Sequence, residues 1–213
     1  VMDVAVLQGA LRLLFLLDAA GLPVSGTNTP PCAVKVVRSE KRMQAMDFWM
    51  RNPDYLAAEI LVLVESGTFP AGDLAVVEKL LMGDEPDLRR YPMVRYLFGA
   101  FEPIDDAFSL LVTPGLATRR RTGKPNGRKS SFFYMLQAGA DATVKIIADD
   151  PDLGWYRDRA ELVARVAGTD AAAAGIPRAV AAAAVAGTAL GSGSTSASRT
   201  QPATWFSVGK SRS

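Results

Sequence analysis

The hydrophobic period of this sequence changes near residue 115, and that change limits what the chain can fold into. Residues 103–113 carry apolar side chains at positions i, i+3, i+4 and i+7, which is the pattern of an amphipathic helix: Ile104, Ala107, Phe108 and Leu111. Two short runs with β-branched or aromatic residues follow, at 116–121 and 129–136. Between them, Asn126-Gly127 favours a tight hairpin turn. The sequence therefore predicts a helix followed directly by a β-hairpin.

Helical patterns fill most of the remaining sequence, at 4–20, 39–52, 53–67, 73–82, 140–148 and 155–166, and another periodic unit begins near Pro92. Three helices, a basic hairpin and a further helix are the element order of a winged helix. We predict a mainly α protein with a small β-hairpin wing. An N-terminal helical segment covers residues 1–72, a winged-helix domain covers 73–168, and an Ala/Gly/Ser-rich tail, predicted to be disordered, covers 169–213.

Local signals mark where several of these helices begin, end and bury their side chains. Ser39 and Asp73 are the expected N-caps of two helices, Pro53 opens a third, and Gly67 ends it. The methionines at spacings of three and four in the second helix are expected in the core: Met43, Met46 and Met50.

The first helix, at residues 4–20, is apolar nearly all round, so it has to be buried nearly all round. Two arrangements satisfy this requirement: a central core helix, or a helix that completes its burial against another chain. The polar residues Gln8, Arg12 and Asp18 interrupt the apolar stretch, which is also short for a membrane span. We therefore expect no membrane segment here.

The composition argues against a catalytic or metal-binding protein. The sequence contains no histidine, which removes the commonest general base and the commonest metal ligand. Cys32 is the only cysteine, which fits a reducing, cytoplasmic compartment. Asp149, Asp150 and Asp152 form the one acidic cluster that suggests a divalent cation, but Pro151 among them favours a solvated helix terminus. We expect no enzyme, no cofactor and no metal.

The predicted hairpin carries the sharpest charge feature of the sequence. It contains six cations and no acidic residue between positions 119 and 130: Arg119, Arg120, Arg121, Lys124, Arg128 and Lys129. Such a cluster fits the binding of nucleic-acid phosphates, because neutralised phosphates release their counterions. The alternative is a solvated hairpin whose charge keeps the protein soluble.

The helix before the hairpin does not match a helix that reads DNA sequence. Its predicted outward face shows Asp105, Asp106 and Ser109, and carboxylates there would repel phosphates. Direct readout in the major groove normally relies on Arg, Lys, Asn or Gln. We therefore expect the wing to contact nucleic acid without a sequence-reading helix.

Short motifs in the middle of the chain resemble those of a known family. These are the segments 47–53 (DFWMRNP) and 93–101 (MVRYLFGAF), followed by Gly115-Leu116. The sequence resembles the middle-component proteins of ABC-three-component, Lamassu-type anti-phage defence systems over residues 40–140. The matching motif positions are Phe48, Arg51, Pro53, Arg95, Tyr96, Gly99, Phe101 and Gly115. In one departure, Gln137 stands where the family's Leu-Thr-x-x-Gly turn has threonine.

The resemblance implies a non-enzymatic winged-helix accessory subunit that binds an SMC-like ATPase subunit and an effector nuclease subunit. It implies structural roles for the motif positions, with Gly99 allowing a tight backbone turn and Tyr96 packing through a ring that has a polar tip. Two other hypotheses stay open. A winged-helix transcriptional regulator would bind a defined operator as a homodimer, and a small metalloenzyme is the weaker hypothesis because histidine is absent.

Overall fold

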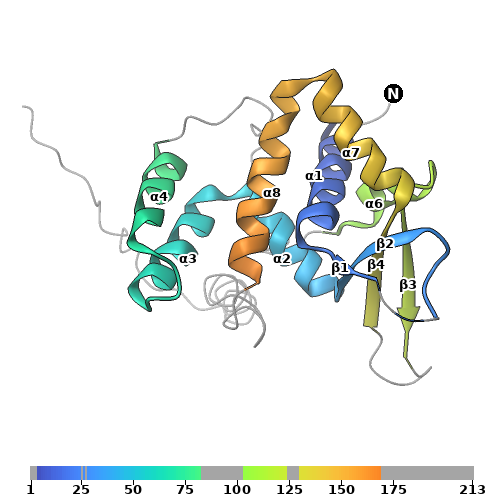
Figure 1. Cartoon of the computed structure of the whole chain (residues 1–213), viewed down its shortest axis with the longest axis horizontal. Coiled ribbons are helices and arrows are strands. Elements are labelled where there is room, and N and C mark those ends of the chain that lie inside the picture. The colour runs from blue at the N-terminus through green and yellow to red at the C-terminus, as the bar shows by residue number, and fades with distance from the viewer. Residues whose placement is uncertain (1–3, 25, 27, 83–102, 124–129, 169–213) are drawn as a thin grey trace, which may run out of the picture.

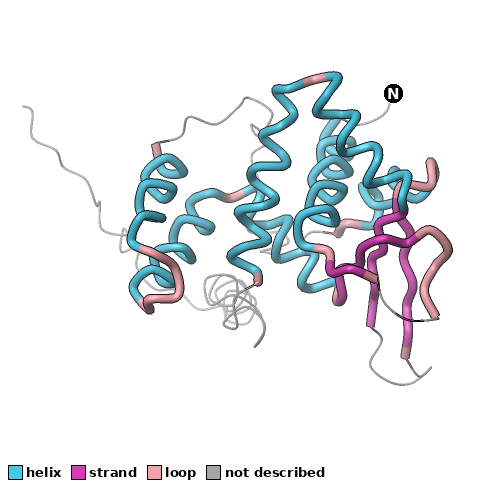
Figure 2. The backbone as a smooth tube through the Cα atoms, in the orientation of Figure 1, coloured by secondary structure: helices cyan, strands magenta, loops and turns pink. Residues whose placement is uncertain are grey.

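The computed structural model describes residues 4–24, 26, 28–82, 103–123 and 130–168. Helices form most of this part of the chain, and the strands gather in one sheet at one end (Figures 1 and 2). The longer helices are α1 (Val4–Ala20), α2 (Glu40–Arg51), α3 (Pro53–Glu65), α4 (Leu74–Leu81), α6 (Asp105–Val112), α7 (Gln137–Asp149) and α8 (Gly154–Ala167), and the 3-10 turns are η1 (Ala71–Asp73) and η3 (Pro151–Leu153). The strands are β1 (Leu22–Pro23), β2 (Ala33–Arg38), β3 (Ala117–Thr122) and β4 (Ser130–Leu136). The prediction of a mainly α protein with a small β-hairpin is confirmed.

Helix α1 lies at the centre of the described fold, where it packs against α8, α6, α2 and α7. Its residues 13–17 are all buried, whereas Val4 and Leu7 near its start are exposed. The core-helix alternative is therefore confirmed for the second half of α1. The methionines of α2 are fully buried, as predicted: Met43, Met46 and Met50.

The sheet is antiparallel, with the strand order β1-β2-β4-β3. Strands β3 and β4 form the predicted hairpin, within one residue of the expected bounds. Strand β2 was not predicted, although Val34, Val36 and Val37 are β-branched residues that favour a strand. It pairs with the other edge of β4. The predicted boundary between residues 72 and 73 thus separates elements that share one sheet and one core.

Ser39 and Asp73 stand at the predicted N-cap positions of α2 and α4, but neither side chain makes a capping hydrogen bond; the two predicted bounds of α3 are right. Ser39 has a φ of 84° and its side chain makes no capping hydrogen bond. Asp73 is buried, and its Oδ1 accepts a hydrogen bond from Arg165 Nη2 at 2.9 Å instead of capping α4. Pro53 opens α3 as predicted, and Gly67 follows its end with a φ of 72°, a conformation that favours glycine.

Helices α3 and α4 lie at the opposite end of the described molecule from the sheet (Figure 1). Helix α4 makes its main contacts with α3 and η1, so it forms an outer edge. None of the helices in the described part of the chain has the length and apolar character that crossing a membrane requires.

Candidate nucleic-acid interface

The hairpin β3–β4 projects from the end of the body, and β3 carries three consecutive arginines (Figure 1). The other predicted cations of the hairpin, Lys124, Arg128 and Lys129, lie outside the described residues. Successive side chains of a strand point to opposite faces of its sheet. Arg119 and Arg121 therefore share one face of β3, and Arg120 lies on the other, so the three arginines do not form one patch.

Arg119 lies on the inner face of the sheet, the face that packs against helix α6. Its Nη1 lies 2.6 Å from Oδ1 of Asp105, the first residue of α6, and is shielded from solvent. Its guanidinium also stacks over the ring of Phe133, 5.8 Å from the ring centroid. The charge of Arg119 thus has two partners within the protein, the Asp105 carboxylate and the Phe133 ring.

Arg121 shares the inner face and lies between two carboxylates. Its Nη2 is 3.9 Å from Asp105 Oδ1 and 4.0 Å from Oε2 of Glu40, at the start of α2. Asp105 and Asp106 are both exposed, which confirms the predicted acidic outward side of α6. The basic strand and the acidic helix therefore meet on one side of the hairpin.

Arg120 lies on the outer face of the sheet and is exposed. Its Nη1 is 3.4 Å from the backbone oxygen of Asn28 in the loop before β2, a long hydrogen bond between neutral oxygen and cation. No carboxylate of the described residues forms an ion pair with it. Of the described predicted cations, Arg120 is thus the one whose charge stays available on the surface.

Where the structure describes the motif positions of the family resemblance, they lie in the core, at a helix start or in a turn. Phe48 is buried and meets Tyr55 edge to face, with ring centroids 5.0 Å apart. Pro53 begins α3, and Gly115 ends the turn after α6 with a φ of 74°. Four motif positions lie outside the described residues: Arg95, Tyr96, Gly99 and Phe101.

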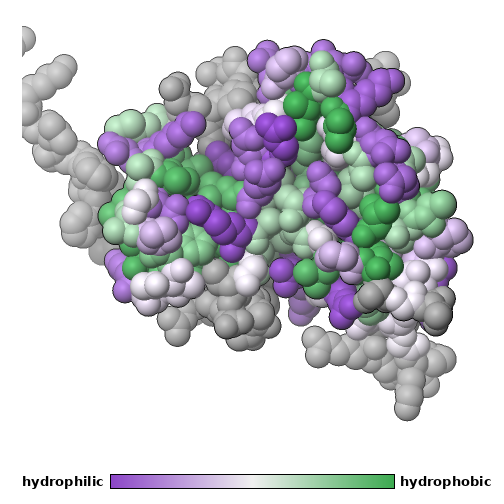
Figure 3. Space-filling model, in the orientation of Figure 1, coloured by the Kyte–Doolittle hydropathy of each residue, from purple (hydrophilic) through white to green (hydrophobic). Residues whose placement is uncertain are grey.

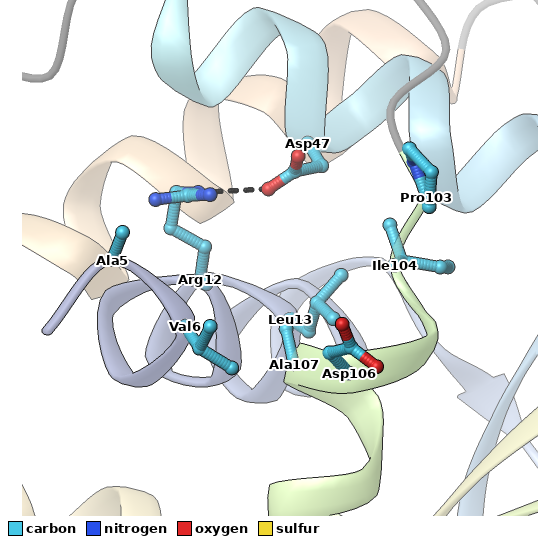
Figure 4. Close-up of a pocket in the computed structure, with 10 residues that line it drawn as sticks. Ala5, Val6, Arg12, Leu13, Asp47, Pro103, Ile104, Asp106 and Ala107 are labelled. Carbon is cyan, nitrogen blue, oxygen red and sulfur yellow. Dashed lines mark hydrogen bonds and ion pairs between the residues drawn. The ribbon is translucent and has the colours of Figure 1, made fainter. Parts of the chain in front are cut away.

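Arg51, the remaining motif residue, belongs to a buried ion-pair network that we did not predict. Asp47 accepts a hydrogen bond from Arg12 Nε at 2.8 Å (Figure 4). It accepts another from Arg51 Nε at 2.9 Å. Burial alone would raise the pKa of Asp47, but the two guanidiniums hold that pKa below its ordinary value. The Asp47–Arg51 spacing of four was a visible signal, whereas Arg12 lies 35 residues away.

The Arg12–Asp47 pair lines a pocket of about 190 Å³ between α1, α2 and the start of α6 (Figure 4). Asp106 and Ala107 line its opposite side. The buried carboxylate of this pocket is already engaged by two arginines. The ion pair therefore joins α1 to α2, and the pocket lining contains none of the predicted hairpin cations.

The acidic cluster after α7 lies at a helix terminus, as predicted. Asp150 ends α7, and its Oδ1 accepts a hydrogen bond from the backbone N–H of Asp152 at 3.1 Å, which caps η3. Within the described ranges, no three acidic or cysteine side chains gather closely enough to hold a metal ion. No protein-family model, curated protein or solved structure matches this chain.

Proposed function

We propose that this chain is a non-enzymatic accessory subunit that contacts nucleic acid through its β3–β4 hairpin without reading base sequence. The observation that carries the proposal is the projecting hairpin, on which Arg120 is exposed and forms no ion pair with a described carboxylate. Phosphate contacts of this kind position a protein on nucleic acid but carry no sequence information.

Helix α6 supports the second part of the proposal, the lack of sequence reading. In a winged helix, the helix before the hairpin would enter the major groove. Here that helix presents Asp105 and Asp106, and Asp105 is paired with a hairpin arginine. A helix with carboxylates at its exposed start is poorly suited to a groove lined by phosphates.

The salt dependence of DNA binding tests the nucleic-acid contact. A variant with Arg119, Arg120 and Arg121 all changed to alanine is expected to bind a 20-base-pair duplex about tenfold more weakly at 0.1 M salt. The slope of log K against log salt should fall by about 0.9 for each phosphate contact that is lost. Fluorescence anisotropy titrations give the affinities.

A matched triple variant provides the control for net charge. Lys79→Ala, Lys145→Ala and Arg157→Ala remove three exposed cations from α4, α7 and α8, away from the hairpin. This variant should bind within about threefold of the wild type, because its lost charges are not phosphate contacts. Equal weakening by both triple variants would contradict a hairpin contact.

The accessory-subunit part of the proposal rests on the family resemblance and on the surface of α3 and α4. Half of the large apolar side chains that are exposed in the described part belong to these helices or follow them directly: Leu61, Val62, Leu74, Leu81 and Met82. Figure 3 shows patches of hydrophobic surface over both helices. Partner proteins commonly cover exposed apolar surface of this kind. By the resemblance, the proposed partners are an SMC-like ATPase subunit and an effector nuclease subunit.

Co-expression of the chain with its neighbouring genes tests this part. We expect the chain to copurify with a large ATPase subunit, and Leu81→Glu should weaken that complex because it places a charge on the exposed apolar surface. Val144→Glu, on the exposed side of α7, is the matched control. A chain that elutes alone, or as a homodimer that binds one operator, would contradict the accessory role.

A further inference from the structure

The outer face of the sheet carries a second exposed arginine that the sequence patterns did not single out. Arg38, the last residue of β2, pairs with Phe132 of β4, and Phe132 pairs with Arg120 of β3. Residues directly opposite in antiparallel strands share a face of the sheet. Arg38, Phe132 and Arg120 therefore form one row across three strands, with the half-buried Phe132 in the middle.

Arg38 is exposed, and no described residue forms an ion pair or side-chain hydrogen bond with it. Among the described residues, Arg120 donates only to the oxygens of Asn28, at 3.4 and 3.5 Å. Neither cation is neutralised by a described carboxylate. A phosphate that approached this row would therefore not have to displace an internal anion.

Acidic residues are missing from the chain segments that build the outer face. Residues 19–39, which include β1, the following loop and β2, contain no Asp or Glu, and neither do residues 107–140. The inner face differs, because Glu40 and Asp105 lie within 4.0 Å of Arg121 or Arg119 and Asp106 is adjacent in sequence. Nucleic acid on the inner face would meet these carboxylates.

We propose that the outer face of the sheet, through Arg38 and Arg120, is the surface that binds the phosphate backbone of nucleic acid. This inference deepens the proposed function and rests on it. It adds Arg38 as a binding residue and assigns Arg119 and Arg121 to ion pairs within the protein. The partner chemistry is a phosphodiester backbone, which both duplex and single-stranded nucleic acid provide.

Two double variants of the full chain test the assignment, since each removes two arginines from the same sheet. Arg38→Ala with Arg120→Ala should lower the salt slope by about 1.8 and weaken duplex binding about 60-fold at 0.1 M salt. Arg119→Ala with Arg121→Ala should change the affinity less than about threefold. Both variants change the net charge equally, so the comparison isolates the face of the sheet.

Glutamine versions of both pairs keep most of each apolar stem and serve if an alanine variant unfolds. A larger loss from the inner-face pair than from the outer-face pair would overturn this inference and leave the hairpin function intact. A wild-type chain that binds neither duplex nor poly-dT would instead overturn the proposed function itself. The wild-type chain can also prefer duplex or poly-dT while the outer-face variant still shows the larger loss. That result supports the assignment and identifies which source of phosphates the face binds.

Discussion

Asp47→Asn is expected to lower the free energy of unfolding by about 3 kcal/mol at neutral pH, the low end for breaking a buried ion pair. The substitution removes the charge that Arg12 and Arg51 both face, at 2.8 and 2.9 Å. Those arginine side chains are only 18% and 12% exposed, so water replaces the lost partner poorly. Urea unfolding followed by circular dichroism measures the change.

The control is Asp158→Asn, which breaks the exposed Arg157–Asp158 pair. Its side chain is 71% exposed, so the loss should stay within about 0.5 kcal/mol. Similar losses from both variants would show that the Asp47 network contributes little beyond a surface pair.

The same network predicts a pH dependence of stability. The pKa of Asp47 is lowered in the folded protein because the Arg12 and Arg51 charges outweigh the effect of burial. A lowered folded-state pKa contributes stability above the ordinary aspartate pKa, and this contribution is lost as pH falls through the lowered value. Asp47→Asn should therefore lose less stability than the wild type on acidification.

Gly139→Ala is expected to destabilise the fold by about 3 kcal/mol, the upper part of the range for overpacking. A Cβ on Gly139, in the first turn of α7, would lie 2.3 Å from the backbone oxygen of Leu116. That oxygen also accepts the hydrogen bond from Leu136 N–H at 3.0 Å, so it cannot move away freely. Thermal unfolding of the purified chain measures the loss.

Gly154→Ala is the matched control, also at the start of a helix. The nearest atom to its added Cβ would be Arg157 Nη2 at 3.9 Å, and its φ of −55° suits alanine. We expect this variant to be neutral or more stable by up to about 1 kcal/mol. If Gly139→Ala were equally well tolerated, the close approach of α7 to Leu116, the residue before β3, would be wrong.

The parts of the fold that depend on local signals were predictable from the sequence. The Asn126-Gly127 pair and the change of period located β3 and β4, and Pro53 and Gly67 located the ends of α3. Strand β2 was missed because its pairing partner, β4, lies about a hundred residues later in the chain. Its valines gave a signal of strand propensity, but propensity alone does not show where a strand pairs.

The candidate site was predictable only in part, for the same reason. The cations of β3 were visible in the sequence, and the two-residue period of a strand already implies that Arg120 faces away from Arg119 and Arg121. The pairing of Arg119 with Asp105 required the packing of α6 on the sheet. Arg38 required the register of β2 on β4, and Asp73 was assigned as a cap because its partner Arg165 is 92 residues away.

The most direct test of the central claim is a competition between two duplexes of equal length and unrelated sequence for the wild-type chain. Anisotropy titrations at several salt concentrations would give both affinities and both salt slopes. A contact with phosphates alone predicts affinities within about threefold and the same steep slope for both duplexes. A preference of about a thousandfold for one sequence, the lower end for specific binding, would contradict the account and would mean that the chain reads bases.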